Sequence, residues 1–119
     1  EKKFSSTIKR KYCIATSSCT GALQIALMAL DIGPGDEVIV PDITWVSTAS
    51  VVEAVGAKPI FVDINVNTLH IDINKCKDLI SDKTKAIMPV HIYGTAVNMD
   101  IVLNFQMRFF QVSISYGYL

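Results

Sequence analysis

Cysteine is scarce in this chain, and the three that occur, Cys13, Cys19 and Cys76, have no Cys-x-x-Cys spacing. An odd number of cysteines without that spacing argues against a disulfide framework and against a zinc site. It favours reduced thiols and therefore a cytoplasmic protein. The two histidines, His70 and His91, lie far apart in the sequence and have no partners at the spacing of metal ligands. We therefore expect no metal site.

Charge of either sign is also sparse. Charged residues make up 18% of the chain, the formal net charge is zero, and the one basic run is Lys9-Arg10-Lys11. A nucleic-acid-binding surface needs a larger basic patch, so a nucleic-acid partner is not expected. No unbroken apolar run approaches the length of a membrane-spanning helix, so we expect no association with a membrane either.

Two glycine-rich phosphate-binding motifs are missing as well. The chain contains no GxGxxG after its first apolar run and no GxxxxGK[ST] anywhere, which excludes the usual fingerprints of dinucleotide and nucleoside-triphosphate binding.

Hydrophobic residues, in contrast, are abundant at 50% of the 119 residues. The length suits one domain or part of one. So high an apolar fraction in a short chain indicates that some apolar surface serves contacts beyond the chain itself.

Short apolar runs alternate with helical patterns along the sequence. We expect the end of an amphipathic helix at residues 1–8, helices over 20–30, 45–55 and 72–80, and strands over 12–15, 37–40, 60–64 and 84–90. Thr44 is the expected N-cap of the helix at 45–55, and Gly56 is its C-terminal glycine. Asp72 or Asn74 is the expected cap of the helix at 72–80. Alternation at such short intervals predicts an α/β fold with a mainly parallel sheet and flanking helices.

The chain is organised around the segment from Tyr12 to Leu30. A short apolar run leads into small polar residues, Thr16 to Gly21, and then into a helix with Leu23 and Leu27 on one face. The first amides of such a helix have no partner inside it, and the helix dipole makes that end positive. A phosphate group suits this place, with hydroxyls nearby from Ser17, Ser18 and Thr20. The same serines and threonine would equally serve as ordinary helix caps.

Five motifs occur in an order that resembles one known family. They are SSCTGAL, GPGDEVIVP, the pair Thr44-Trp45, GAKPIFVD, and PVHIYG. Together they make the chain similar to the DegT/StrS-type sugar aminotransferases, which use pyridoxal 5′-phosphate (PLP) and have the aspartate-aminotransferase-like fold. The resemblance covers nearly everything from Phe4 to Asp100. It implies that residues 1–100 are part of the large domain of a fold-type-I PLP-dependent transferase.

The resemblance also implies roles for four residues. The turn Ser18-Cys19-Thr20 would hold the cofactor phosphate through backbone amides and the threonine hydroxyl, although relatives usually carry glycine or alanine where this chain has Cys19. Trp45 would lie against the face of the pyridine ring, where an indole stacks favourably. From the sequence alone, a core tryptophan at the start of a helix is an equal alternative. For His91 we expect a structural role.

Two groups that the chemistry needs are missing. In the family, a carboxylate pairs with the pyridinium nitrogen and a lysine forms the Schiff base with the cofactor. Residues 101–119 contain no Asp, Glu or Lys, and their apolar residues keep no clean helical or strand period. Lys58, Lys75 and Lys85 are in surface-like positions. We therefore expect no catalytic residue in this chain, and we interpret it as a fragment whose tail, 101–119, is truncated or aberrant.

The resemblance implies a function for the parent protein. It would transfer an amino group, typically from glutamate, to a keto carbon of a nucleotide-linked sugar, and would act as a homodimer. This chain alone is expected to be inactive. Two alternatives remain open: a non-catalytic α/β module that binds a phosphorylated small molecule, or a non-functional remnant.

Overall fold

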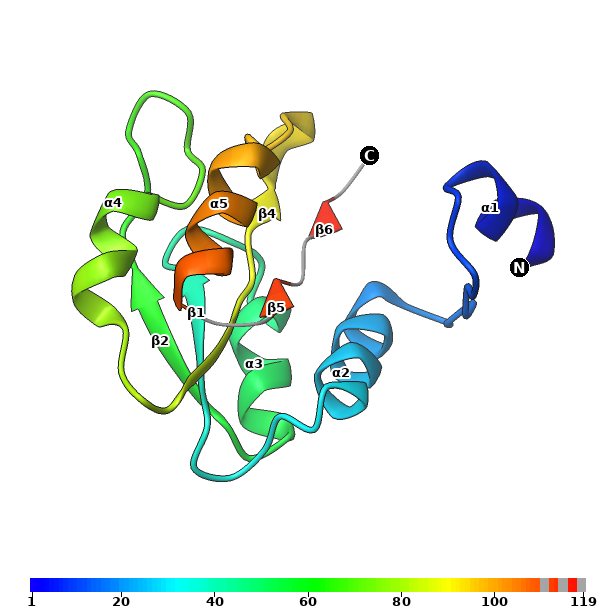
Figure 1. Ribbon diagram of the computed structural model, residues 1–119, viewed down its shortest axis with the longest axis horizontal. Coiled ribbons are helices and arrows are strands. Elements are labelled where there is room, and N and C mark those ends of the chain that lie inside the picture. Colours follow the sequence, from blue (N-terminus) through cyan, green and yellow to red (C-terminus); the bar gives the residue numbers. More distant parts are fainter. Residues whose placement is uncertain (110–111, 114–115, 118–119) are drawn as a thin grey trace.

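The computed structural model describes residues 1–109, 112–113 and 116–117 (Figure 1). In chain order its elements are α1 (Lys2–Thr7), α2 (Cys19–Ala29), β1 (Glu37–Pro41), α3 (Ser47–Ala54), β2 (Lys58–Val62), α4 (Ile73–Cys76), the 3₁₀ turn η1 (Lys77–Leu79), β3 (Thr84–Ile87), β4 (Val90–His91), the 3₁₀ turn η2 (Ile92–Gly94), α5 (Met99–Phe109), β5 (Val112–Ser113) and β6 (Tyr116–Gly117).

The main sheet is parallel throughout. Its strand order is β2-β1-β3-β5, and β4 and β6 form a separate parallel pair. This confirms the predicted α/β class with a mainly parallel sheet. Strand β1 lies inside the sheet, and Val38, Ile39 and Val40 are fully buried, as expected for a strand covered on both faces.

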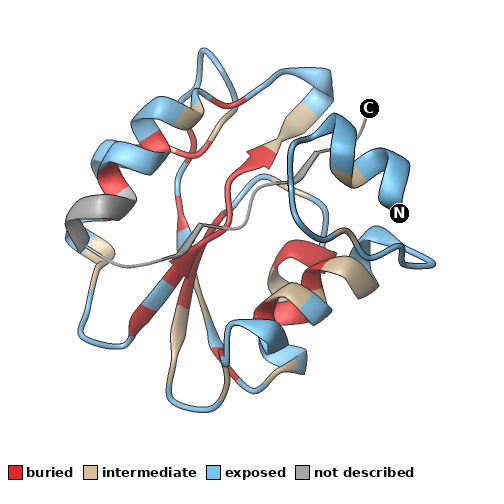
Figure 2. Ribbon diagram, turned by 45° about the vertical axis from the view of Figure 1, so that its right-hand side comes forward, coloured by how far each residue is buried: buried red, intermediate tan, exposed pale blue. Residues whose placement is uncertain are grey.

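Helices cover both faces of this sheet. Successive side chains of a strand point to opposite faces. Accordingly, Val38 and Val40 belong to the core cluster under α2 and α3, whereas Ile39 belongs to the cluster under α4 and α5. Figure 2 shows the buried residues on the central strands and on the helix surfaces that face them. The result is a three-layer arrangement with one hydrophobic core on each side of the sheet.

Helix α2 forms where the sequence predicted a helix. Ser18 is its N-cap, with an extended backbone (φ −156°, ψ 157°), and its Oγ accepts a hydrogen bond from the Gly21 amide at 3.1 Å. Leu23 and Leu27, four residues apart, are buried against the sheet. The predicted apolar face therefore anchors this helix in the core.

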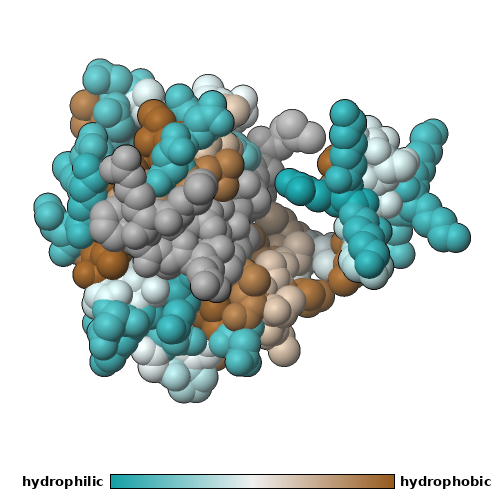
Figure 3. All heavy atoms as spheres, in the orientation of Figure 1, coloured by the Kyte–Doolittle hydropathy of each residue, from teal (hydrophilic) through white to brown (hydrophobic). Residues whose placement is uncertain are grey.

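Of the two expectations about the first residues, the strand is wrong and the helix is confirmed. The run 12–15 is not a strand: Tyr12 and Ile14 are 75% and 70% exposed, and no neighbouring strand pairs with them among the described residues. Helix α1 does form, but it buries none of its residues, and Phe4 remains 60% exposed. Figures 1 and 3 show this N-terminal arm projecting from the body as a separate, mostly hydrophilic lobe. Without a surface to cover, its apolar residues stay exposed.

The helix after β1 begins later than predicted. Thr44 is not its N-cap, because α3 starts at Ser47 after Val46, which already has helical backbone angles. The Thr44 hydroxyl instead bonds the Thr48 hydroxyl at 2.8 Å. Residues 42–46 form a loop rather than a first helical turn, and the Thr44 hydroxyl bonds across its end instead of capping the helix.

Three other predicted elements have different boundaries in the structure. The strand predicted at 60–64 is β2, Lys58–Val62, because its register follows β1. The helix predicted at 72–80 is α4 followed by η1; Asp72 caps it by accepting from the Asn74 amide at 3.0 Å. The strand predicted at 84–90 divides into β3 and β4 around Pro89, which has no amide hydrogen to continue the ladder.

Residues beyond Asp100 do continue a helix. Helix α5 runs from Met99 to Phe109, and Val102 and Phe105, three residues apart, are buried in the second core cluster. The expectation that no helical period persists there is wrong for these residues. The predicted division of the chain at residue 100 stays a prediction, and its part at 110–111, 114–115 and 118–119 lies outside the described residues.

Gly56 ends α3 as predicted, and it allows a matched stability test. Its φ is +83°, and an added Cβ would lie 3.0 Å from Pro34 Cγ. Gly35 has a similar φ of +95° but open space around a built Cβ. Left-handed backbone costs a non-glycine residue about 1–2 kcal/mol. In chemical denaturation, Gly56→Ala should therefore lose at least this much stability and more than Gly35→Ala. Equal losses would show that contact with Pro34 adds nothing.

Candidate functional site

The N-terminus of α2 presents two free backbone donors. Among the hydrogen bonds of the described part of the chain, none uses the amide of Cys19 or of Thr20, whereas the Gly21 and Ala22 amides are taken by Ser18. Residues 16–20 are exposed. The two amides therefore face solvent at the positive end of an eleven-residue helix.

A side-chain bond joins this helix end to the loop after β1. Thr20 Oγ1 lies 2.9 Å from Ser47 Oγ, and Ser47 is only 8% exposed. Ser47 opens α3, six residues after Pro41 ends β1. The bond therefore places the first turn of α2 at the carboxyl edge of the sheet, where ligands bind in open α/β folds.

Trp45 lies in the loop that this bond anchors. Its side chain is 61% exposed, with Ile43 and Val46 beside it in sequence also exposed. Its carbonyl accepts a hydrogen bond from the Thr48 amide at 3.0 Å, and the bond between Thr44 and Thr48 closes the loop from the other side. Trp45 is thus not the buried core tryptophan of the alternative interpretation.

His91 is held by the backbone. Its Nδ1 accepts a hydrogen bond from the Val97 amide at 3.0 Å, so its neutral ring carries the proton on Nε2. This bond closes the turn that contains Tyr93 and Gly94, both with positive φ. The geometry fits the structural role expected for His91.

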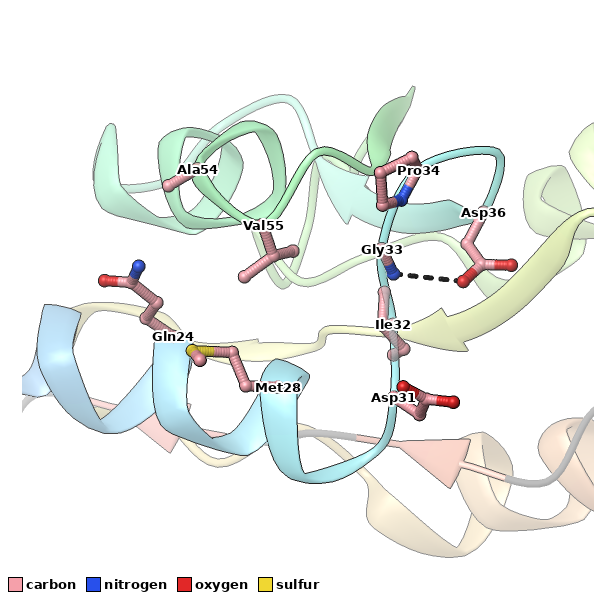
Figure 4. Close-up of a pocket in the computed structure, with 9 residues that line it drawn as sticks. All are labelled: Gln24, Met28, Asp31, Ile32, Gly33, Pro34, Asp36, Ala54 and Val55. Atoms are coloured by element: carbon pink, nitrogen blue, oxygen red, sulfur yellow. Dashed lines mark hydrogen bonds between the residues drawn. The ribbon is translucent and has the colours of Figure 1, made fainter.

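A hollow of about 510 Å³ lies elsewhere, between the C-terminal ends of α2 and α3 (Figure 4). Gln24 and Met28 line it from α2, Val55 from the end of α3, and Gly33 from the turn before β1, where the Asp36 carboxylate accepts from the Gly33 amide at 3.0 Å. This is the amino edge of β1, opposite the Thr20–Ser47 contact. The hollow is therefore separate from the candidate site.

The lysines considered for a Schiff base are on the surface, and Cys19 is a thiol within the site itself. Lys58, Lys75 and Lys85 are exposed, as predicted, and Lys75 pairs with Asp63 on the surface, which lowers the pKa of that carboxyl. Cys13, Cys19 and Cys76 are free thiols, and burial raises the pKa of Cys76 to about 12. Within residues 1–109 and the short β5 and β6 segments, no group of three metal-ligating side chains comes together.

The residues present fit a phosphate ester. Two uncommitted amides, the positive end of α2 and the Thr20 hydroxyl lie together in one exposed turn. If PLP is the ligand, Cys19 and Thr20 would hold its phosphate through these groups, and Trp45 would offer its exposed indole to the ring. When bound, PLP supplies an electron sink for chemistry at an amine carbon.

The parallel sheet with helices on both faces is that of the fold-type-I aminotransferases, and the model of the DegT/DnrJ/EryC1/StrS aminotransferase family matches residues 1–109. The chain belongs to this family. The match extends past residue 100 to the end of α5.

Three relatives illustrate the similarity. The spore coat polysaccharide biosynthesis protein SpsC of Bacillus subtilis is 46% identical over 87% of this chain and 26% of its own length. GDP-perosamine synthase of Caulobacter vibrioides is 45% identical over 91% of this chain and 29% of its own. The crystal structure of NtdA from Bacillus subtilis with bound cofactor PMP is 41% identical, with a TM-score of 0.91 over 97% of this chain and 26% of that one. The chain thus spans between a quarter and a third of these relatives.

Sequence reasoning missed Ser47. It belongs to no motif that we singled out, and its only signal was a small polar residue next to a tryptophan at a helix start. Its burial and its bond to Thr20 depend on bringing together residues 27 positions apart.

None of the helices in the described residues is long and apolar enough to cross a bilayer.

Proposed function

We propose that this chain forms the cofactor-phosphate-binding part of a PLP-dependent sugar aminotransferase. The observation that carries the proposal is the pair of free amides at Cys19 and Thr20, tied through Ser47 to the loop of Trp45. In this proposal Ser18 shapes the turn as the N-cap, Cys19 and Thr20 bind the phosphate, and Trp45 covers the pyridine ring.

The proposed substrates follow from the relatives. Members with similar sequences are named for nucleotide-linked sugars, among them GDP-perosamine synthase and a UDP-2-acetamido-2-deoxy-3-oxo-D-glucuronate aminotransferase of Pseudomonas aeruginosa. The parent enzyme would take an amino group, typically from glutamate, and place it on a keto carbon of such a sugar. We place it in the cytoplasm, where its three free thiols stay reduced, and expect a homodimer.

We propose that this chain by itself does not catalyse the amino-group transfer. No carboxylate or lysine follows Asp100, and the exposed Lys58, Lys75 and Lys85 lie on the surface. In the described residues the Thr20–Ser47 contact consists of two hydroxyls, which neither pair with a pyridinium nitrogen as a carboxylate does nor form a Schiff base as a lysine does. The chain's own part is to bind and orient, with Thr20 and two amides fixing the phosphate.

The test uses Trp45 as its own reporter, since it is the one tryptophan in the sequence. Pyridoxamine 5′-phosphate (PMP) is the ligand, because its amine cannot condense with surface lysines as the aldehyde of PLP would. We expect PMP to quench the fluorescence of Trp45 in a saturable way, inorganic phosphate to compete, and pyridoxamine to quench far less. Equal quenching by PMP and pyridoxamine would contradict the proposal.

The second candidate is a stand-alone module that binds a phosphorylated small molecule. The free amides would bind the phosphate, and lysines exposed on the surface would leave the module without a covalent link to a cofactor. A sharp monomer peak in gel filtration and a cooperative thermal melt by circular dichroism would support it. The third candidate, a non-functional remnant, is favoured by exposed apolar residues such as Phe4 and Val46, which are 60% and 72% exposed. Aggregation or a gradual melt would support that candidate.

A further inference from the structure

We infer that Ser47 is a positioning residue for the phosphate, acting through Thr20; the inference rests on the proposed function. No motif of the chain singles out this serine. It is 8% exposed, and its hydroxyl lies 2.9 Å from that of Thr20. The hydroxyl of this buried serine, at the start of α3, therefore has one defined side-chain partner, an exposed threonine on α2.

Which hydroxyl donates in the Thr20–Ser47 hydrogen bond follows from the donors and acceptors that each one carries. Each hydroxyl has one proton to donate and lone pairs to accept with. Thr20 can donate to an anion only if it does not donate to Ser47, so in the bound state Ser47 donates to Thr20 Oγ1. A hydroxyl that accepts one hydrogen bond donates a stronger one, because the two bonds polarise each other. Ser47 thereby turns the Thr20 proton toward the ligand and strengthens its bond.

The same residue connects the two halves of the site. Ser47 follows Trp45 by two positions, and the next residue, Thr48, bonds the Trp45 carbonyl at 3.0 Å and the Thr44 hydroxyl at 2.8 Å. Within the described part of the chain, the Thr20–Ser47 hydrogen bond links this loop to α2. This hydrogen bond fixes the position of the phosphate-binding turn relative to the loop that carries Trp45.

The experiment is a double-mutant cycle on the purified chain, with PMP affinity measured by calorimetry and by Trp45 quenching. One lost hydrogen bond of this kind should weaken binding roughly 3- to 10-fold in Ser47→Ala. Thr20→Ala should weaken it by at least as much. In the Thr20→Ala background, Ser47→Ala should cause no further loss, because its partner is already gone. Ser47→Thr, which keeps the hydroxyl, should restore affinity to within about 2-fold of the wild type.

Ser50→Ala is the matched control, since Ser50 lies on the same helix, is exposed, and makes no side-chain hydrogen bond among those of the described residues. It should leave PMP affinity unchanged. Wild-type binding with an unaffected Ser47→Ala variant would overturn this inference alone. Losses that multiply in the double variant would also overturn it, because they indicate a general structural effect. No phosphate-dependent binding by the wild type would overturn the proposed function and this inference together.

Discussion

Replacement of Leu27 by alanine is expected to lower the free energy of unfolding by about 2–5 kcal/mol, as truncations of fully buried leucines do. Leu27 is 0% exposed and is among the largest fully buried side chains of the described residues. It packs in the cluster that joins α2 and α3 to one face of the sheet, with Val40 and Val52 among its members. The loss combines burial with the cavity left behind, and urea denaturation followed by circular dichroism measures it.

Met28 provides the control for this variant. It is the next residue on the same helix, it has a similar volume, and it is 62% exposed. Met28→Ala should change stability by no more than about 0.5 kcal/mol. A Leu27→Ala loss below about 1 kcal/mol would show that α2 is not anchored by this face. Packing of α2 would then no longer explain why the free amides of Cys19 and Thr20 lie at the carboxyl edge of the sheet.

Replacement of Cys19 by proline is expected to weaken PMP binding roughly 10- to 100-fold, the value of one hydrogen bond to a charged group. Cys19 is the first residue of α2, where proline fits because its missing amide hydrogen has no partner inside the helix. The preceding Ser18 has the extended backbone that a following proline requires. The substitution therefore removes one donor from the proposed site and keeps the helix. Calorimetric titration with PMP measures the effect.

Cys19→Ala separates the amide from the thiol. It keeps the N–H and removes only the exposed sulfur, so PMP should bind it about as well as the wild type. Both variants should melt at similar temperatures. If Cys19→Pro bound PMP as tightly as Cys19→Ala, the amide of residue 19 would play no part in binding.

The sequence predicted much of this fold because each strong local signal agreed with the tertiary structure. The period of Leu23 and Leu27 and the small polar turn before them were enough to locate α2. The continuous apolar run of Val38, Ile39 and Val40 indicated a strand buried on both faces, which it is. The glycine at position 56 predicted the end of α3, and its positive φ in the structure confirms this.

The missed features depend on partners far away in the sequence. Tyr12 and Ile14 have strand-forming character, but no strand in the described residues lies beside them, so they remain exposed coil. Thr44 has the chemistry of an N-cap, yet Thr48 takes its hydroxyl and the helix begins at Ser47. The link between Thr20 and Ser47 joins two separate helices. No local pattern indicates a contact of that kind.

The most direct test of the site is an amide-resolved NMR titration of the ¹⁵N-labelled chain with PMP. We expect the backbone amides of Cys19 and Thr20 and the indole N–H of Trp45 to shift together and to saturate at one ligand concentration, while Gly33, in the hollow at the opposite edge of β1, stays unchanged. Shifts confined to Gly33 and its neighbours, or none at Cys19 and Thr20, would contradict the account.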